Sequence, residues 1–212
     1  MIIDLHVHTK AFSSDSNLDP EEAIKEAKKV GLDGICFTEH NKVWEIEEIR
    51  RLSQKWGFLV ANGVEVDTVE GHVLVFGLHR DFERIIHVQE LREMANQAGG
   101  VMIAAHPFKS FRVFGVSDLS LSPEQASQRP IFKSVDALEG FSGKTAEKEN
   151  ILAQEVARIL GMNMTGGSDA HSLEAIGKCV TIFENNIKDE AGLVEELKRG
   201  RFQAAYFRGQ GG

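Results

Sequence analysis

The chain alternates short apolar runs with longer segments in which apolar residues recur at helical spacing. The apolar runs predict strands at residues 2–9, 34–38, 58–66, 73–78, 101–105, 135–141, 162–165 and 178–183. The helical spacing predicts helices at residues 20–30, 44–56, 82–98, 145–160 and 188–199. Alternating strands and helices are typical of an α/β sheet or barrel. We therefore expect one α/β domain over residues 1–212, with a frayed tail at 207–212.

The first apolar run ends in two histidines, His6 and His8. Residues two apart in a strand lie on the same face, so both imidazoles can reach one metal ion. A pair of histidines on the polar side of an edge strand would show the same spacing. Four more histidines accompany later apolar runs, namely His40, His72, His106 and His171. Because the carboxyl ends of parallel strands meet at one face, we expect these side chains to converge.

Carboxylates accompany these histidines and complete a set of candidate metal ligands. The set is His6, His8, Asp15, His40, Glu65, His72, His106, Asp169 and His171. Imidazole and carboxylate donors together favour Zn²⁺, Mn²⁺ or Fe²⁺, and nine ligands suffice for two or three such ions. Glu65 is the natural bridge, since a carboxylate can place one oxygen on each of two ions. Pro107 biases the backbone of His106 toward an extended conformation.

The amino-acid composition makes some classes of partner improbable. The net charge is −8 and the pI is near 5.5, which disfavours long nucleic acids as partners. No apolar stretch approaches the roughly 20 residues of a membrane helix, so we expect no membrane partner. Cys36 and Cys179 are too few for a disulfide framework, and Met1 leads directly into the first strand without a signal segment. These features predict a cytoplasmic protein.

Five motifs occur in order between residue 2 and about residue 183: D-L-H-V-H-T, T-E-H-N, G-V-E-V followed by G-H-V-L, A-A-H-P, and G-S-D-A-H. Together they resemble the PHP (polymerase and histidinol phosphatase) family of metal-dependent phosphoesterases. The resemblance implies a distorted seven-stranded (β/α)7 barrel, similar to a TIM barrel, with a trinuclear site at the carboxyl ends of the strands. It implies His6, His8, Glu65 and Asp169 around one ion, Glu65 with His106 and His72 around a second, and Asp15, His40 and His171 around a third.

Two positions depart from the family pattern. Glu39 stands in T-E-H where the family more often has Asp, and we expect it to act behind the ligands. Ser142 stands where relatives often carry Asn, which leaves the role of Glu139 open.

The activity that the resemblance implies is hydrolysis of a small phosphomonoester, of a nucleotide or histidinol-phosphate type. The nucleophile would be a hydroxide bridging two ions, with Glu65, Asp169 and His171 in the catalytic centre. Lys109 and Arg112 are candidates to bind the phosphate. The alternative is that both are charged residues of a solvent-exposed loop without a role in binding. The native metal, the oligomeric state and the leaving group are left open.

Two other functions are compatible with parts of the pattern. A metal-dependent amidohydrolase also begins with H-x-H, but neither Lys109 nor Lys133 ends an apolar run as a bridging lysine would. A non-catalytic metal-binding module that docks a partner is the second alternative. The presence of every expected ligand type favours an active enzyme.

Overall fold

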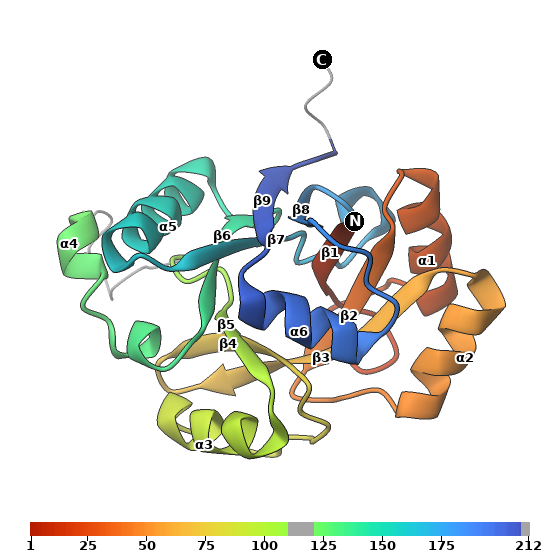
Figure 1. Ribbon diagram of the computed structural model, residues 1–212, viewed down its shortest axis with the longest axis horizontal. Coiled ribbons are helices and arrows are strands. Elements are labelled where there is room, and N and C mark those ends of the chain that lie inside the picture. The colour runs from red at the N-terminus through yellow and green to blue at the C-terminus, as the bar shows by residue number, and fades with distance from the viewer. Residues whose placement is uncertain (110–120, 209–212) are drawn as a thin grey trace.

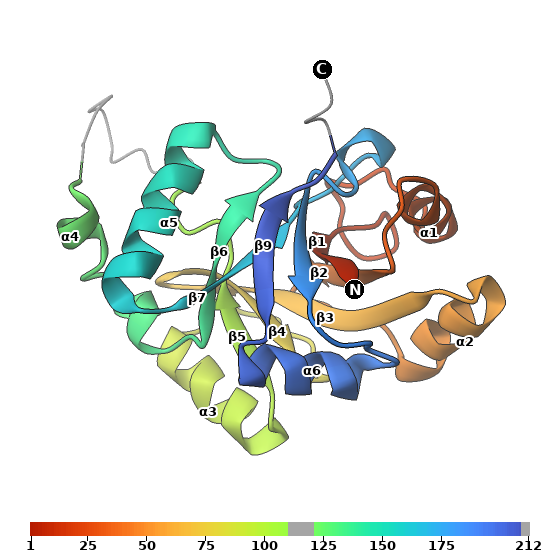
Figure 2. The same cartoon turned by 45° about the horizontal axis from the view of Figure 1, so that its top comes forward.

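The computed structural model describes residues 1–109 and 121–208 and builds them around one nine-stranded sheet. The sheet order is β7, β6, β5, β4, β3, β2, β1, β8, β9. The bounds are β1 Ile2–Val7, β2 Gly34–His40, β3 Leu59–Thr68, β4 Gly71–Phe76, β5 Val101–Ala104, β6 Ala137–Ser142, β7 Asn163–Gly167, β8 Cys179–Phe183 and β9 Phe202–Tyr206. The sheet curls into a barrel-like form at the centre of the molecule (Figures 1 and 2).

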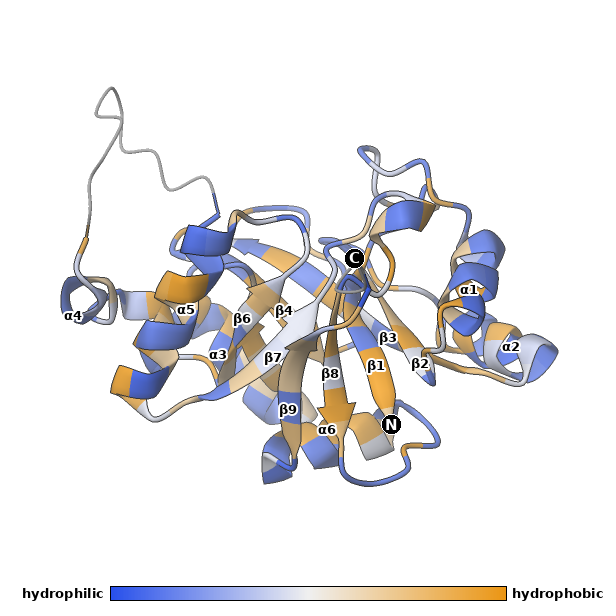
Figure 3. Ribbon diagram, turned by 90° about the horizontal axis from the view of Figure 1, so that it is seen from above, coloured by the Kyte–Doolittle hydropathy of each residue, from blue (hydrophilic) through white to orange (hydrophobic). Residues whose placement is uncertain are grey.

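Helices surround this sheet. The described residues form six α-helices: α1 Pro20–Lys29, α2 Ile46–Trp56, α3 Val88–Ala98, α4 Pro123–Ala126, α5 Glu147–Leu160 and α6 Glu190–Arg199. Figure 3 shows apolar residues along β1 and β8 and a mixture of apolar and polar residues on the helices around them. Such amphipathic helices bury one stripe against the sheet. No helix of the described residues is long and apolar enough to cross a membrane.

Local sequence explains where these elements begin and end. Asp19 caps α1 by accepting the backbone N–H groups of Glu21 and Glu22 at 3.0 and 3.3 Å, and Pro20 occupies the first turn, as predicted. The helix predicted for residues 82–98 begins only at Val88, because Ile86 instead bridges to the end of β3 at Thr68.

The strand count differs from the seven strands of a (β/α)7 barrel. β9 was not predicted, because its five residues are partly exposed and follow the last helix directly. β4 runs antiparallel to both of its neighbours, and β8 runs antiparallel to β1. The fold is therefore mixed α/β. Phe207 and Arg208 donate backbone hydrogen bonds to Lys178 and Gly177, whereas residues 209–212 of the expected frayed tail lie outside the described residues.

The sheet curls because the segment after β7 returns to β1. Ala170 forms a parallel bridge with Val7, accepts the His8 N–H at 2.9 Å and donates its own N–H to the His6 carbonyl at 3.2 Å. This contact brings the segment after β7 beside the histidines of the first strand.

The seam between β7 and β8 depends on Gly166. The Thr181 hydroxyl lies 2.9 Å from both the N–H and the carbonyl of Gly166, so it accepts from one and donates to the other. A Cβ on Gly166 would lie 2.4 Å from the carbonyl oxygen of Val180. The two strands can approach this closely only with glycine at this position.

We expect Gly166→Ala to lower the free energy of unfolding by about 1–3 kcal/mol, because the methyl group overpacks the seam. Chemical denaturation measures this change. Gly192→Ala in α6 is the matched control, since its Cβ would make only ordinary contacts at 3.5 Å or more. The control should stabilise the protein by about 0.5–1 kcal/mol. Equal effects of the two substitutions would contradict the role given to the seam.

Candidate metal centre

All nine predicted metal ligands converge at one end of the barrel-like sheet. Most lie at or just beyond the ends of strands, whereas Glu65 lies within β3 and Asp15 is on the loop between β1 and α1. His72 stands near the start of β4, and because β4 is antiparallel to β3, that start lies beside the end of β3. The turn after β7 carries Asp169 and His171 into the same region.

Glu65 on β3 is at the centre of the cluster. Its side chain is fully buried. Its nearest imidazole nitrogens are His106 Nε2 at 2.9 Å, His40 Nδ1 at 3.0 Å, His72 Nδ1 at 3.1 Å, His8 Nε2 at 3.3 Å and His6 Nε2 at 3.6 Å. Glu65 Oε2 faces His40, His8 and His6 in this set, yet no described residue donates it a hydrogen bond of good geometry. A buried carboxylate oxygen surrounded by imidazole nitrogens in this way is suited to a bound cation.

His6, His8 and Asp169 form the most buried group of potential ligands. His6 Nε2 lies 3.0 Å from His8 Nε2, and Asp169 Oδ1 lies 3.7 and 3.4 Å from these two nitrogens. Ligand atoms around a tetrahedral ion with bonds of about 2.0–2.1 Å are separated by about 3.3–3.4 Å. The spacing and chemistry of these donors therefore fit a divalent transition metal.

Two further groups lie on either side of the first. His8, His40 and His171 offer three ligand atoms within 4.8 Å of one another, and His6, Glu65 and His106 offer another three. Asp15 contacts the first of these groups through Oδ2, 2.9 Å from His171 Nε2.

The electrostatics of the cluster also favour bound positive charge. Burial alone would lower the pKa of His6, but the carboxylates of Glu139, Glu65 and Asp169 raise this pKa well above its usual value. Burial would raise the pKa of Asp169, but the charges of His6 and His106 and a hydrogen bond with His8 hold this pKa well below its usual range. The pKa of Glu65 is likewise held well below its usual value, so Asp169 and Glu65 stay ionised and attract cations.

Glu139 on β6 has a role that the sequence left open. Its Oε1 lies 3.0 Å from His6 Nδ1, and its Oε2 accepts the backbone N–H of His106 at 2.8 Å. A carboxylate on the second ring nitrogen fixes the orientation of a ligating histidine. Gly167 leaves room for this contact, because a Cβ there would lie 2.5 Å from His6 Cβ and 2.6 Å from Glu139 Oε1.

The prediction of an extended backbone at His106 was wrong. His106 has φ of 27°, and Asp169 also has a positive φ, of 50°. The hydrogen bond from the His106 N–H to Glu139 holds the residue in this strained conformation despite the proline that follows. Strained non-glycine residues concentrate at functional sites, and both of these belong to the cluster.

A cleft of about 330 Å³ opens beside the cluster and is lined by basic side chains. His72, His106, Lys109 and Arg129 line it together with Ile131. The Lys109 ammonium forms an ion pair with Asp169 Oδ2, so this lysine reaches the cluster itself. Arg129, which sequence reasoning missed, donates to the carbonyls of Pro107 and Glu70 and lies over the Phe108 ring. Arg112 lies outside the described residues.

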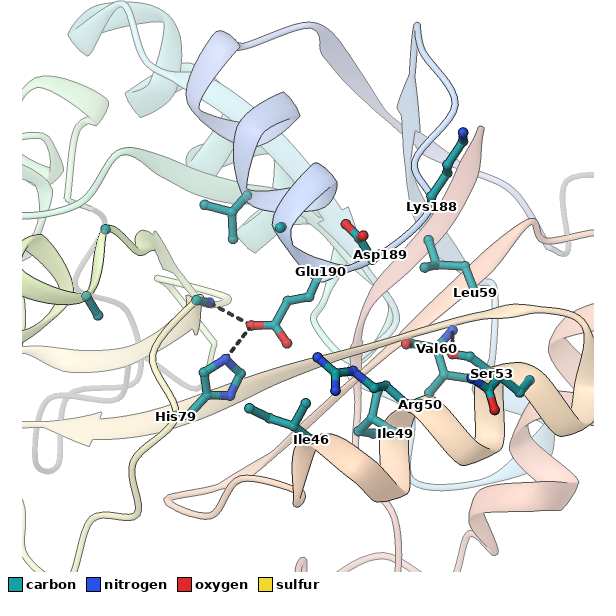
Figure 4. A pocket seen from close by; sticks show the side chains of 16 residues that line it. Ile46, Ile49, Arg50, Ser53, Leu59, Val60, His79, Lys188, Asp189 and Glu190 are labelled. Atoms are coloured by element: carbon teal, nitrogen blue, oxygen red, sulfur yellow. Dashed lines mark hydrogen bonds and ion pairs between the residues drawn. The ribbon is translucent and has the colours of Figure 1, made fainter.

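His79 and His87, the two histidines that are not among the predicted ligands, lie outside the cluster. His87 contacts Glu70 at 2.9 Å. His79 contacts Glu190 at 3.1 Å in a cavity of about 670 Å³ between α2 and α6, beside the start of β3 (Figure 4). This cavity is larger than the cleft at the cluster but contains none of the predicted ligands.

Comparisons with known proteins agree with this arrangement. A family model described as PHP-associated matches residues 147–202. The uncharacterized protein MJ1587 of Methanocaldococcus jannaschii is 32% identical over 117 residues, which cover 51% of this chain and 68% of that protein.

Solved structures share the fold at low identity. A protein of Bifidobacterium adolescentis, whose assignment as a metal-dependent phosphoesterase is itself provisional, superposes with a TM-score of 0.67 at 19% identity, covering 93% of this chain and 96% of that one. An amidohydrolase of Chromobacterium violaceum, determined with bound sulfate, gives a TM-score of 0.66 at 14% identity and 99% coverage of both chains. These structures show a shared fold, and the ordered motifs with the PHP-associated family model place the chain in the PHP domain family.

Proposed function

We propose that the protein is a metal-dependent phosphoesterase that hydrolyses a small phosphomonoester at a centre of two to three Zn²⁺, Mn²⁺ or Fe²⁺ ions. The observation that carries this proposal is the buried Oε2 of Glu65, which receives no hydrogen bond of good geometry although imidazole nitrogens of three histidines lie within 3.6 Å. The ligands would be His6, His8, Asp15, His40, Glu65, His72, His106, Asp169 and His171.

The chemistry divides between the ions and the chain. Bound divalent ions would supply Lewis acidity toward the phosphoryl oxygens and would make a water acidic enough to act as nucleophile near neutral pH. Glu65, Asp169 and His171 would hold these ions in place. Lys109, at the edge of the cluster, would bind a phosphoryl oxygen once a metal has taken over the charge of Asp169.

The adjoining cleft favours a small substrate. Its volume of about 330 Å³ is at the lower end of ligand pockets, and its apolar wall includes Ala105, Pro107 and Ile131. A compact leaving group of a nucleotide or histidinol-phosphate type would fit a space of this size. The net charge of −8 disfavours a long polynucleotide.

The fold is shared with a protein named as an amidohydrolase, so that reaction class is the second candidate. Lys109 reaches the cluster, although it does not end an apolar run as a bridging lysine would. However, Glu65 already lies between the histidine groups and could bridge two ions without a lysine. Phosphate release from phosphomonoesters, measured beside hydrolysis of N-acyl amino acids, separates the two classes. Amide hydrolysis without phosphate release would refute the phosphoesterase proposal.

We expect Lys109→Gln to lower kcat/KM for a phosphomonoester by about 10- to 100-fold while metal content stays constant, since one charge-assisted contact to phosphate is lost. Steady-state kinetics and elemental analysis measure both quantities. Lys42→Gln is the control, because Lys42 pairs with Asp81 in an exposed ion pair outside the cluster. Unchanged kinetics in Lys109→Gln would remove this lysine from the substrate site.

A further inference from the structure

Ser13 lies on the loop between β1 and α1 and is 1% exposed. Its hydroxyl oxygen has three polar neighbours: Glu39 Oε2 at 2.6 Å, His8 Nδ1 at 3.2 Å and the backbone nitrogen of His40 at 3.3 Å. A serine hydroxyl has one proton to donate and two lone pairs to accept with. The three contacts therefore use its full capacity, and their directions can be worked out.

Two of the three directions are set by the partners. The backbone N–H of His40 can only donate, so it occupies one lone pair of Ser13. The carboxylate of Glu39 can only accept, so it takes the single proton of Ser13. The remaining contact must then be a hydrogen bond from His8 Nδ1–H to the second lone pair of Ser13.

Glu39 is surrounded by hydrogen-bond donors. Its Oε1 accepts the indole N–H of Trp44 at 3.0 Å and the Thr9 hydroxyl at 2.5 Å, and its Oε2 accepts the Thr9 backbone N–H at 2.9 Å. Indole and backbone N–H groups have no acceptor function, so each carboxylate oxygen faces at least one obligatory donor. Glu39 is fully buried, and these contacts leave its orientation no freedom.

We infer that Glu39 and Ser13 are positioning residues that keep a proton on Nδ1 of His8, so that Nε2 is the nitrogen left to bind a metal. His8 Nε2 faces the centre of the cluster, 3.0 Å from His6 Nε2 and 3.4 Å from Asp169 Oδ1. Imidazole that binds a metal through Nε2 carries its proton on Nδ1. The inference rests on the proposed metal centre, but the proton on Nδ1 can be measured separately in protein freed of metal.

The function of this chain of contacts is to prepare the ligand before the metal arrives. If the proton were on Nε2, metal binding would require the proton to leave and the ring to lose its contact with Ser13. Partners of the second ring nitrogen typically contribute about 10- to 100-fold to metal affinity. The same chain of contacts ties the loop that carries Asp15 to the end of β2.

The test compares Ser13→Ala with Ser16→Ala. Ser16 is a buried serine of the same loop whose hydroxyl donates to the backbone carbonyl of His8 at 2.8 Å, without touching the ring. The ring ¹⁵N signals of ¹⁵N-histidine-labelled, metal-free protein report the tautomer, with His8 assigned by its loss in His8→Asn. Zn²⁺ affinity is measured by competition with a chelator of known affinity.

Wild-type protein and Ser16→Ala should show His8 protonated on Nδ1. Ser13→Ala should show a mixture of tautomers and an about 10- to 100-fold weaker Zn²⁺ affinity. Ring signals of His8 that do not change in Ser13→Ala would overturn the inference. Loss of Zn²⁺ affinity that is equal in both variants would also overturn it, since the effect would then be only structural.

Glu39→Gln tests the first member of the chain. A glutamine has one accepting oxygen where Glu39 has two, so the Ser13 proton loses its acceptor and can turn toward His8 Nδ1. The expected result is a shift of the His8 ring proton toward Nε2 in the folded variant. A His8 ring that stays fully protonated on Nδ1 would show that Ser13 acts without Glu39. Complete absence of Zn²⁺ binding in the wild-type protein would instead refute the proposed metal centre.

Discussion

Glu65→Gln should lower kcat/KM for phosphomonoester hydrolysis by about 10³-fold or more and remove at least one metal ion per chain. The substitution keeps the shape of the side chain but removes the charge and one accepting oxygen at the point where the histidines converge. Loss of Lewis-acid stabilisation worth several kcal/mol corresponds to a rate change of this size. Steady-state kinetics, elemental analysis and circular dichroism of the same preparation measure activity, metal content and fold.

The matched control for this substitution is Glu190→Gln. Like Glu65, Glu190 lies beside a histidine, but it is only partly buried and lies in the cavity between α2 and α6 (Figure 4). Burial raises the pKa of Glu190, so an uncharged amide should replace it at little cost. Its activity should stay within about twofold of wild type. Full activity and metal content in Glu65→Gln would exclude Glu65 as a bridging ligand.

Removal of metal by a chelator should abolish phosphate release and lower the melting temperature without unfolding the protein. The Lys109 ammonium and the imidazoles can balance the carboxylates of Asp169 and Glu65 after chelation, so we expect the fold to persist. A metal present at 100 times its dissociation constant raises the free energy of unfolding by about 2.7 kcal/mol for each site. For a chain of this length, that corresponds to a melting temperature about 5–11 °C higher for each occupied site.

Adding single metals back to the chelated protein shows which kind of ion the centre binds. Zn²⁺, Mn²⁺ or Fe²⁺ should restore both activity and melting temperature, because imidazole nitrogens make up most of the ligands. Mg²⁺ prefers a shell of oxygens and should restore far less. Activity that persists after exhaustive chelation would contradict a metal-dependent reaction.

The sequence allowed prediction of the ligand cluster because strand ends obey a simple rule. Carboxyl ends of parallel strands meet at one face, so histidines after separate apolar runs were expected together, and the structure places them within contact distance. The helix cap at Asp19 and the β3–β4 pairing follow equally local signals.

Other features depended on contacts between distant segments. Glu139 meets His6 across 133 residues of sequence, and no spacing rule links the two. The positive φ of His106 runs against the local bias of Pro107 and is held by that same glutamate. β9 forms because β8 offers it a free edge, a property of the assembled sheet and not of its own five residues.

The contacts of Glu39 were likewise only partly predictable from the sequence. Its place behind the ligands was expected from the family pattern, and the structure gives four hydrogen bonds from Thr9, Ser13 and Trp44 to its carboxylate. Its link to the ring of His8 through Ser13 needed the three-dimensional arrangement of the loop.

Metal content per chain, measured on protein without a histidine tag together with phosphate release in the presence of Mn²⁺, tests the central claim most directly. The substrates are p-nitrophenyl phosphate, AMP, a nucleoside 3′,5′-bisphosphate and histidinol phosphate. We predict two to three ions per chain and metal-dependent release of phosphate from at least one of them. Less than one tightly held ion per chain and no release would contradict the account and favour a non-catalytic module that docks a partner.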